Sequence, residues 1–372
     1  MASDTVEVRV SPPYPVTVGE DVLREIVDTL DPRPCAILTD SNVGPRHGAN
    51  LRRSLEVAGW TVVGVVEVPA GEASKNVATY ADAVGRLARM GLTRDGALFA
   101  LGGGVVGDLG GFVAATYMRG IDLVMLPTSL LAMVDSAVGG KTGLDLPEGK
   151  NLVGAFVRPL LVAADPGWLC TLPEAEVSNG LAEIVKMGLL AGGRFFEDLD
   201  LIAAARAGDA AALRALILHS IRFKAEVVAE DEREGGRRAI LNYGHTIGHA
   251  LEAAAGFSLP HGSAVAAGMV AEAAISRARF GTDLTELHER LLEAAGLPRR
   301  CSGIGVEAAL LAMSRDKKRS AAHGGNGGTE DAAAHRFVLL RDVGLPVYGV
   351  PVGDAEARQA IGAVVGQRGW RG

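Results

Sequence analysis

The sequence has 372 residues, more than the ~250–300 that one hydrophobic core usually holds, so we expect two domains. Hydrophobic residues make up 48% and charged residues 22%, which excludes a disordered, collagenous or coiled-coil chain. The net charge is −7 and no basic patch stands out, so nucleic acid is not expected as a partner.

Neither membrane insertion nor disulfide bonding is indicated. The N-terminus carries an early acid, Asp4, and no later segment has ~18 uncharged apolar residues in a row. We therefore expect a cytoplasmic protein with no membrane partner. The three cysteines, Cys35, Cys170 and Cys301, are far apart, and we predict that each is a small buried residue.

Short β-rich runs alternate with helical stretches as far as Pro173, which predicts an α/β domain with a mostly parallel sheet. Two of the intervening stretches, Arg46–Ala58 and Ser74–Met90, have the apolar spacing of helices that pack on a sheet. The predicted strands are Val6–Val10, Cys35–Thr39, Val62–Val68, Ala97–Leu101, Leu123–Leu126 and Leu160–Ala164.

Beyond Pro173 the apolar pattern is helical almost throughout, so we predict a mainly α-helical domain over residues 174–372 after an α/β domain over residues 1–173. Ser320–His335 is rich in Gly, Ala and His and is expected to be a mobile loop before the strand-like Phe337–Leu340. The predicted helices are Ala175–Leu190, Asp209–Glu230, Ile240–Ala255, Ser263–Phe280 and Asp283–Ala295.

A glycine cluster, Gly102–Gly104, follows the predicted strand at Ala97–Leu101 and opens a helix that contains Asp108. Backbone N–H groups of such a turn can bind a pyrophosphate, and the helix N-terminus adds partial positive charge. The spacing is not GxGxxG, and a tight packing turn explains it equally well. Asp40 and Asn42 follow the strand Cys35–Thr39 and allow two interpretations, a nucleotide-binding site or a turn with a helix cap.

Histidines form a second pattern. His245 and His249 are four residues apart on one predicted helix, His261 follows soon after, and Glu183 lies upstream. Three such ligands with an open fourth position make a catalytic zinc site. The alternative is a pair of histidines that hydrogen-bond in a polar core. The third histidine and the carboxylate favour the metal.

Cationic and amide side chains form a third pattern, because many of them follow glycine-rich turns or lie near the candidate ligands. Such a pocket suits an anionic, phosphorylated substrate, since Arg binds phosphate or carboxylate with two hydrogen bonds and Lys supplies a compact charge. The residues are Arg119, Lys141, Lys150, Asn151, Lys186, Lys224 and Arg238.

Together these motifs resemble the 3-dehydroquinate synthase family, which belongs to the sugar phosphate cyclases. The resemblance runs in order from about Val6 to Val350. It is carried by GGGVVGD at 102–108, PTS at 127–129, VDSAVGGKTG at 134–143, GKN at 149–151, LAEIVK at 181–186, DERE at 231–234 and NYGHTIGH at 242–249.

The resemblance implies an NAD-binding α/β domain, a helical metal domain and a homodimer. It assigns Zn²⁺, or another divalent metal such as Co²⁺, to Glu183, His245 and His261, and it moves His249 out of the ligand set to a proton-handling position. It implies catalytic roles for Asp135, Lys141, Lys186, Lys224, Glu234 and His249.

Substrate and cofactor residues are carried over in the same way. The resemblance implies that Arg119 reaches a phosphate pocket of a neighbouring subunit. The other implied substrate residues are Lys150, Asn151, Arg238, Asn242, Lys317 and Lys318. The implied NAD residues are Asp40, Asn42, Glu72, Lys75, Gly103, Gly104, Asp108, Thr128 and Ser129, where Ser129 replaces the second Thr that is usual in the family.

The implied reaction converts a phosphorylated heptulosonate to 3-dehydroquinate and phosphate. It proceeds by transient oxidation with bound NAD⁺, β-elimination of phosphate, reduction and an intramolecular aldol closure. Lys224, Arg238 and Asn242 favour a substrate with a carboxylate over a neutral sugar phosphate, which would leave these groups unpaired.

Three other functions stay open. An aminodehydroquinate synthase, which takes the amino or imino analogue in aminohydroxybenzoate antibiotic biosynthesis, would have nearly the same pocket. A metal-dependent NAD polyol dehydrogenase shares the architecture but has no evident use for Lys141 and Lys150. A non-catalytic NAD-sensing module would need none of the cations or metal ligands.

Overall fold

The computed structural model describes residues 3–20, 22–320 and 335–366. The chain divides into two compact units. The first contains Met1–Val177 and Ile217–Glu232, and the second contains Ser178–Leu216 and Arg233–Gly372. The sequence predicted that residues 1–173 bind NAD and that residues 174–372 bind the metal. This functional division stays a prediction.

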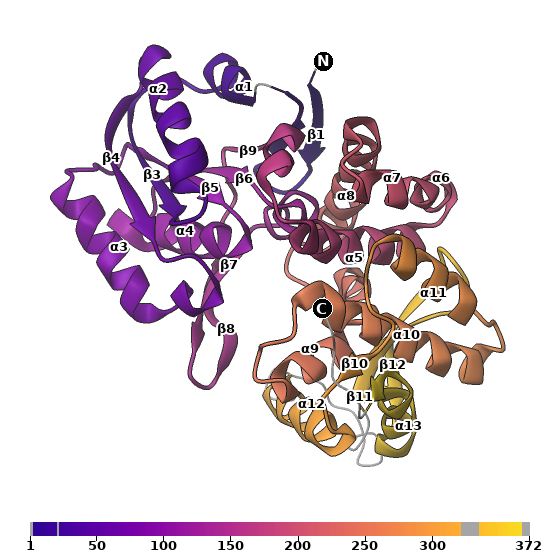
Figure 1. Cartoon of the computed structure of the whole chain (residues 1–372). Helices are drawn as coiled ribbons and strands as arrows, with labels where there is room; N and C mark the ends of the chain where they lie inside the picture. The colour runs from indigo at the N-terminus through magenta and orange to yellow at the C-terminus, as the bar shows by residue number, and fades with distance from the viewer. Residues whose placement is uncertain (1–2, 21, 321–334, 367–372) are drawn as a thin grey trace. The chain divides into compact units, whose positions relative to one another are not determined.

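A seven-stranded sheet is the framework of the first unit (Figure 1). Every neighbouring pair is parallel except β1 and β2, which form an antiparallel hairpin. The strands, in their order across the sheet, are β1 (Asp4–Val8), β2 (Tyr14–Val18), β9 (Leu161–Ala164), β6 (Asp122–Pro127), β5 (Ala97–Gly102), β3 (Pro34–Asp40) and β4 (Thr61–Val68).

The apolar runs in the sequence become the central strands because both of their faces are covered. All six residues of β5 are buried, and Phe99 of β5 packs edge-to-face on Trp60 with ring centroids 5.1 Å apart. The mostly parallel α/β fold predicted from the sequence is confirmed. The helices of this unit before Pro173 are α1 (Val22–Thr29), α2 (Ala49–Val57), α3 (Val77–Arg89) and α4 (Gly104–Thr116), with short turns η1 (Gly44–Gly48), η2 (Glu72–Ser74), η3 (Tyr117–Arg119), η4 (Ala132–Ser136) and η5 (Pro166–Thr171).

Two features of the first unit differ from the expectation. The predicted strand Val6–Val10 is displaced to Asp4–Val8, and its partner β2 was not predicted. A second hairpin, β7 (Lys141–Leu146) with β8 (Gly149–Phe156), was also missed, because glycines interrupt both strands and hide the alternation. Cys170 was expected to be buried and is exposed, whereas Cys35 and Cys301 are buried.

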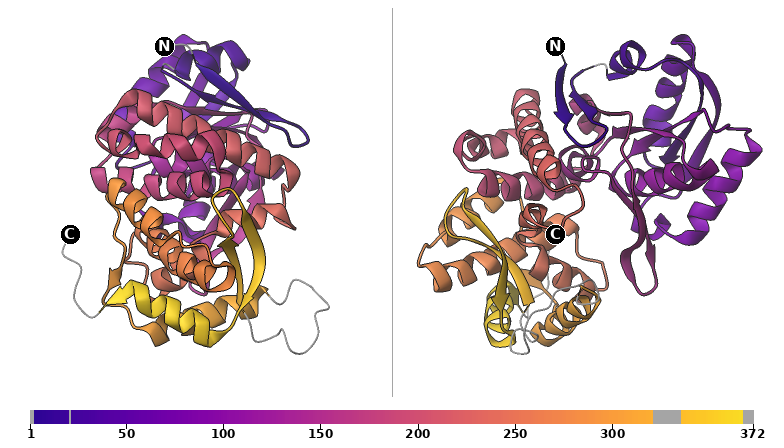
Figure 2. Two further views of the ribbon diagram at one scale, coloured as in Figure 1. Left: turned by 90° about the vertical axis from the view of Figure 1, so that its right-hand side faces the viewer. Right: turned by 180° about the vertical axis from the view of Figure 1, so that it is seen from behind.

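The second unit is mainly helical, as predicted, and its described residues include two small pairs of strands, β10 (Cys301–Ser302) with β13 (Val365–Gly366) and β11 (His335–Leu340) with β12 (Pro346–Val352). The strands β11 and β12 pair antiparallel, and β11 packs on α10, as Figure 2 shows in yellow and orange. The other elements beyond Pro173 are α5 (Glu174–Ala191), α6 (Gly193–Glu197), η6 (Asp198–Leu201), α7 (Ile202–Arg206), α8 (Ala210–Glu230), η7 (Arg237–Asn242), α9 (His245–Ala254), α10 (His261–Phe280), α11 (Thr285–Ala294), α12 (Val306–Ser320) and α13 (Asp354–Val364).

The predicted helix Ile240–Ala255 is the main error in this unit. Its first residues form the 3₁₀ turn η7, and α9 begins only at His245 because Gly244 adopts a left-handed conformation with φ 77°. The predicted loop Ser320–His335 was too long, since Ser320 ends α12 and His335 begins β11, and its interior lies outside the described residues. Within the described ranges, no helix is both long and apolar enough to span a bilayer.

Candidate functional site

The glycine turn of the first unit joins β5 to α4. A Cβ on Gly102 would lie 2.5 Å from the Cβ of Val106, so packing explains that glycine. Gly103 is the N-cap of α4 and offers no capping side chain. Thr128 and Ser129 follow the neighbouring strand β6, and the Thr128 N–H donates to Gly102 O at 2.9 Å. The turn therefore combines tight packing with a helix N-terminus that suits an anion.

Asp40 forms a turn at the end of β3. Its Oδ1 accepts the N–H groups of Asn42 at 2.8 Å and Val43 at 3.0 Å. The structure thus contains the side-chain turn that the sequence offered as one alternative. A contact of Asp40 or Asn42 with a nucleotide stays a prediction.

Lys75 is the centre of a charged cluster within the first unit. Its side chain is 5% exposed, and Nζ lies 2.8 Å from Asn151 Oδ1 and 3.1 Å from both Asp108 Oδ2 and Glu72 Oε1. Burial acts to lower the pKa of Lys75, but Asp108 and Glu72 outweigh it and the pKa is raised. Burial raises the pKa of Asp108 to about 6, against the effect of Lys75.

Lys150 and Asn151, which we had assigned to the substrate, belong to the same cluster as the predicted NAD residues Glu72 and Lys75. Lys150 Nζ is 3.7 Å from Glu72 Oε1. Asp145 was missed as a site residue. Its carboxylate accepts the Asn151 N–H at 2.8 Å, and its own N–H donates to Lys75 O at 2.7 Å, so it fixes the β7–β8 hairpin to this cluster.

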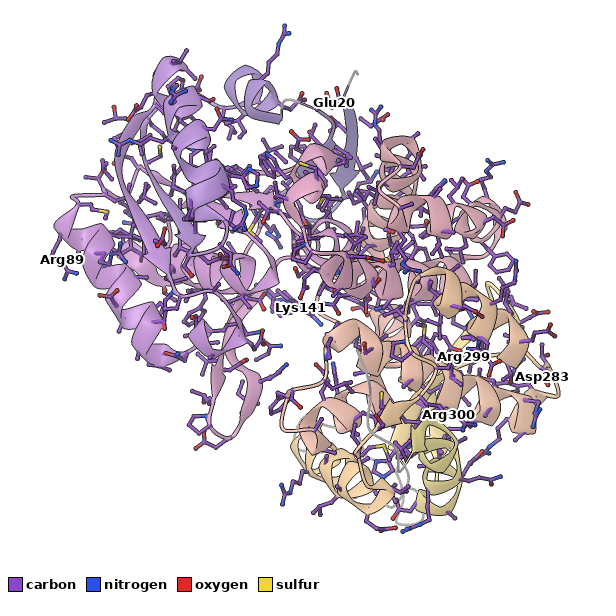
Figure 3. All side chains as sticks on the ribbon, viewed as in Figure 1. Glu20, Arg89, Lys141, Asp283, Arg299 and Arg300 are labelled. Atoms are coloured by element: carbon purple, nitrogen blue, oxygen red, sulfur yellow. The ribbon has the colours of Figure 1, made fainter. Side chains whose placement is uncertain are left out.

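Lys224 and Asp135 form a second charged pair in the first unit. Lys224 Nζ donates to both Asp135 Oδ1 and the Asp135 carbonyl at 2.6 Å, although 89 residues separate them. Lys141 begins β7 and is exposed (Figure 3), as is Arg119, which has a positive φ of 66°.

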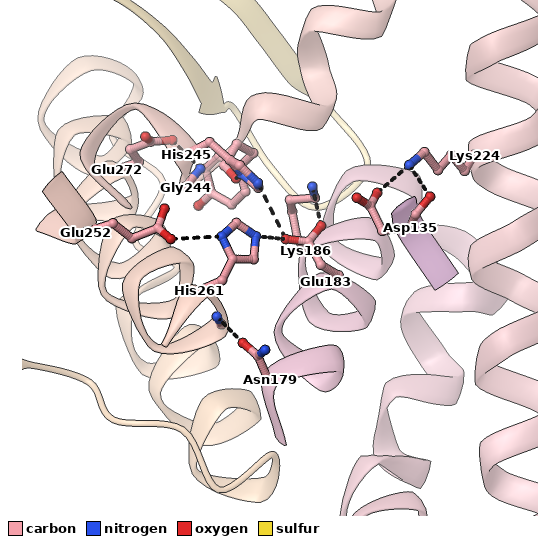
Figure 4. Close-up of polar contacts among 12 residues, drawn as sticks. Asp135, Asn179, Glu183, Lys186, Lys224, Gly244, His245, Glu252, His261 and Glu272 are labelled. Carbon is pink, nitrogen blue, oxygen red and sulfur yellow. Dashed lines mark hydrogen bonds and ion pairs between the residues drawn. The ribbon is translucent and has the colours of Figure 1, made fainter. Parts of the chain in front are cut away.

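The candidate metal ligands come together in the second unit (Figure 4). Nε2 of His245 and Nε2 of His261 each lie 3.5 Å from Glu183 Oε1. Neither oxygen of Glu183, which is 1% exposed, makes a well-formed hydrogen bond, although Lys186 Nζ contacts Oε2. Ligands of a tetrahedral zinc at ~2.0–2.1 Å are separated by about 3.3–3.5 Å, so this donor set fits a divalent metal.

The electrostatics of this cluster favour ionised Glu183. Burial alone would raise the pKa of its carboxyl, but Lys186 and then the two histidines outweigh burial and hold it well below its usual value. Burial and Lys186 together lower the pKa of His245 well below its usual value. Glu183 and His245 are thus in the state that binds a metal, a carboxylate with a neutral imidazole. Burial would lower the pKa of His261, but Glu183 and Glu252 outweigh it and raise this pKa to about 10, so a metal bound there would displace a proton.

Each of the two candidate ligand histidines has a contact at its other ring nitrogen, which is a common feature of metal sites. His245 Nδ1 lies 3.0 Å from Tyr243 O, and His261 Nδ1 lies 3.6 Å from Glu252 Oε1. Glu252 was not predicted. Its position three residues after His249 on α9 could have drawn attention to it, because the two share a helix face.

His249 is exposed, and its ring centroid lies 5.1 Å from that of His245. His249, Glu252 and His261 form a second set of three possible ligands. The geometry therefore brings Glu183, His245 and His261 together and places His249 beside them. Metal analysis of His249 and His261 variants can distinguish the two possible ligand sets.

Glycines allow the ligand-bearing helices to meet. A Cβ on Gly268 of α10 would lie 1.9 Å from Gly244 O, and a Cβ on Gly262 would lie 2.6 Å from Asn179 O. The N–H of Gly262 donates to Asn179 Oδ1, which joins the start of α10 to α5. Close helix approach thus places His245, His261 and Glu183 at one point.

The remaining predicted residues of the second unit lie in or beside η7. Arg238 is buried, and Asn242 Nδ2 donates to Glu234 Oε1 at 2.9 Å. Glu232, which precedes Glu234 by two residues, pairs with Arg158 in the first unit. Lys317 and Lys318 fall at the end of α12, and their side chains lie outside the described residues.

Comparisons with known families agree with this arrangement. The model described as 3-dehydroquinate synthase N-terminal matches residues 65–179, and the one described as 3-dehydroquinate synthase C-terminal matches residues 180–319. The chain belongs to the 3-dehydroquinate synthase family. Membership confirms the resemblance seen in the sequence, and the chain is an enzyme of the 3-dehydroquinate synthase type, a carbon–oxygen lyase.

Relatives and solved structures extend the comparison. A 3-dehydroquinate synthase of Symbiobacterium thermophilum is 48% identical over 82% of this chain and 88% of its own length. One of Xanthomonas axonopodis pv. citri is 46% identical over 92% of this chain and 94% of its own length.

Two cyclase structures share the fold. A 2-deoxy-scyllo-inosose synthase complexed with carbaglucose-6-phosphate, NAD⁺ and Co²⁺ has a TM-score of 0.84, 27% identity, and coverage of 96% of this chain and 99% of its own. A 2-epi-5-epi-valiolone synthase from Streptomyces hygroscopicus subsp. jinggangensis 5008 with NAD⁺ and Zn²⁺ has a TM-score of 0.82 at 25% identity, covering 94% and 96%. An iron-containing alcohol dehydrogenase from Thermotoga maritima has a TM-score of 0.64 at 16% identity over 94% of this chain and 97% of its own, which is a likeness of fold alone.

Proposed function

We propose that this enzyme converts a heptulosonate 7-phosphate to 3-dehydroquinate and inorganic phosphate, using bound NAD⁺ and a divalent metal such as Zn²⁺ or Co²⁺. The observation that carries the proposal is the Glu183–His245–His261 cluster, which lies in the part of the chain matched by the C-terminal family model. The two cyclases of similar structure, which hold NAD⁺ with Co²⁺ or Zn²⁺, support the cofactors.

The chain's own residues would hold these groups and the substrate. When bound, the metal supplies Lewis-acid polarisation of substrate oxygens and NAD⁺ supplies a reversible hydride acceptor. Glu183, His245 and His261 would hold the metal, while the glycine turn at Gly103 and Gly104 would bind the NAD⁺ pyrophosphate. The remaining proposed NAD residues are Asp40, Asn42, Glu72, Lys75, Asp108, Thr128 and Ser129.

Lys186 contacts Glu183 and would add positive charge where the substrate oxygens become more negative. His249, exposed beside the ligand histidines, would carry a proton. Asp135 would keep Lys224 in place through the two 2.6 Å contacts, and Glu234 would orient Asn242. Lys141, Lys150 and Asn151 would bind the substrate, and Arg119 would contribute to a partner subunit's phosphate pocket in a homodimer.

We propose Arg238 as the main partner of the substrate carboxylate. It is 3% exposed, and a buried guanidinium binds a carboxylate through two hydrogen bonds. Arg238→Ala should lower kcat/KM by about 30-fold to a few thousand-fold, since truncating one side of a buried charged pair costs ~2–5 kcal/mol. NAD⁺ affinity should be unchanged. A less stable variant with near-normal kcat/KM would assign Arg238 a structural role and contradict this proposal.

The test of the function is incubation of the purified, NAD⁺- and zinc-loaded enzyme with the heptulosonate phosphate and, separately, with its amino analogue. Phosphate release and the cyclic product are measured. Faster turnover of the heptulosonate supports the proposal. Preference for the amino analogue would instead assign the enzyme to aminodehydroquinate synthesis, and activity on neither compound would contradict the proposal.

A further inference from the structure

Helix α9 begins at the proposed ligand His245, and it lacks a cap of its own. Its N-cap is Gly244, with φ 77° and no side chain. A Cβ there would lie 2.6 Å from Met269 Cγ and 2.9 Å from Val265 O, so none of the usual capping residues fits. The first N–H groups of the helix therefore need acceptors from elsewhere in the protein.

Glu272, on the neighbouring helix α10, supplies such an acceptor (Figure 4). Its Oε2 accepts the N–H of Gly244 at 2.7 Å. Glu272 is fully buried, and its Oε1 makes no hydrogen bond among the described residues. Burial raises the pKa of this carboxyl well above its usual value, although the backbone N–H groups of Gly244, Ile247 and Thr246 act in the opposite direction. The carbonyl oxygen of this carboxyl group accepts the Gly244 N–H in either protonation state.

Tyr243 fixes the other side of His245. Its carbonyl lies 3.0 Å from His245 Nδ1, so it selects the tautomer that directs Nε2 toward Glu183. Its hydroxyl lies 2.8 Å from His288 Nε2, and His288 Nδ1 lies 2.7 Å from Leu284 O. Because a carbonyl can only accept, Nδ1 of His288 carries the proton and Tyr243 donates to Nε2.

We propose that Glu272 and Tyr243 are positioning residues for the metal: Glu272 fixes the start of α9, and Tyr243 fixes the imidazole of His245 that binds the ion. This inference rests on the metal site of the proposed function. Neither residue is expected to touch metal or substrate. Their effect is to reduce the freedom of a ligand before the ion binds, and outer contacts of this kind typically change metal affinity 10–100-fold.

The experiment compares full-length wild type with Glu272→Met, Tyr243→Phe and the control Ser276→Ala. Ser276 is equally buried and lies one turn along α10, but its hydroxyl joins Glu272 O to the Leu340 N–H of β11. Each protein is stripped of metal and titrated with Co²⁺, followed by visible absorption, and with Zn²⁺ against a chelator. Melting temperature is measured on the same samples.

Glu272→Met removes the acceptor of the Gly244 N–H and should weaken Zn²⁺ and Co²⁺ binding about 10–100-fold and change the Co²⁺ spectrum. Tyr243→Phe removes the hydroxyl contact with His288 that holds Tyr243, and with it the carbonyl at His245, in place, so it should weaken binding in the same direction. Ser276→Ala should lower the melting temperature and leave both metal affinities unchanged. If Glu272→Met does not fold, Tyr243→Phe decides the question.

Unchanged metal affinity in the Glu272 and Tyr243 variants would overturn the inference. So would a loss of metal affinity in Ser276→Ala that equals the loss in those variants when the melting temperatures fall by the same amount. A wild-type protein that binds neither Co²⁺ nor Zn²⁺ would instead contradict the proposed metal site. The two failures are therefore distinguishable without any measurement of activity.

Discussion

At the residue scale, His249 and His261 differ in what surrounds them. His261 lies between Glu183 and Glu252, whereas His249 is exposed beside His245. We predict that His261→Ala loses bound metal and that His249→Ala keeps most of it while losing turnover. Metal analysis of the two purified variants checks this. Equal metal loss in both would favour the alternative ligand set His249, Glu252 and His261.

A second residue-scale prediction concerns pH and His288. Burial lowers the pKa of this imidazole to about 4, from 6.5 in an exposed histidine. Between these values the unfolded chain binds the proton and the folded protein does not, so stability falls as pH falls from about 6.5 to 4. One proton contributes about 1.4 kcal/mol per pH unit, or roughly 3 kcal/mol over the window.

The check is denaturant unfolding of wild type and His288→Gln at several pH values from 7 to 4. Gln can still accept a hydrogen bond from Tyr243 but does not titrate, so the variant should lose stability less steeply on acidification. Parallel pH profiles for the two proteins would contradict this account of His288.

The sequence shows which candidate metal ligands come together more readily than the contacts that surround them. Glu183, His245 and His261 fall in motifs that can be recognised by residue type, and the structure brings them together. Glu252, Glu272 and Asp145 are single acids with no such signal. Their importance comes from backbone groups and ring nitrogens that only the folded chain places beside them.

At the scale of elements, long apolar helices and buried strands were predicted well, because burial fixes their pattern. The exceptions share a cause. The β7–β8 hairpin and the start of α9 contain glycines whose role is close backbone approach, and such contacts leave no periodic pattern. Arg238 lies in the 3₁₀ turn η7 and is separated from α9 by the break at Gly244.

The contact between α9 and α10 gives a prediction at this scale. Because a Cβ on Gly268 would lie 1.9 Å from Gly244 O, Gly268→Ala should push the two helices apart. We expect a cost of about 1–3 kcal/mol in stability and weaker metal binding, since α9 carries His245 and α10 carries His261. Melting temperature and Zn²⁺ affinity are the measurements.

Gly362→Ala is the matched control. Gly362 lies inside α13 of the same unit, and a Cβ there meets nothing within 4 Å. This change should be neutral or stabilising by up to about 1 kcal/mol, because alanine is the better helix former. A normal melting temperature and metal affinity in Gly268→Ala would show that the helices tolerate the added methyl group.

At the scale of the whole molecule, the candidate NAD residues and the candidate metal ligands lie in separate compact units. The chain was long enough to predict two parts, yet the stretch Ile217–Glu232 groups with the first unit across the sequence. The order of residues in the sequence does not reveal this grouping, because it depends on contacts between distant residues such as Lys224 and Asp135. Periodicity marks helices but not which neighbours they contact.

The division predicts how the enzyme depends on its two proposed cofactors. Removing the metal by chelation should abolish turnover, and zinc should restore it, because the proposed reaction needs polarised substrate oxygens. NAD⁺ binding, measured by calorimetry, should persist in the chelated protein, since the candidate NAD residues are in the first unit.

During turnover NADH absorbance should not accumulate, because the proposed conversion to 3-dehydroquinate and phosphate has no net redox change. NADH formed in proportion to product would indicate a polyol dehydrogenase, and full activity without metal would contradict the proposed cyclase.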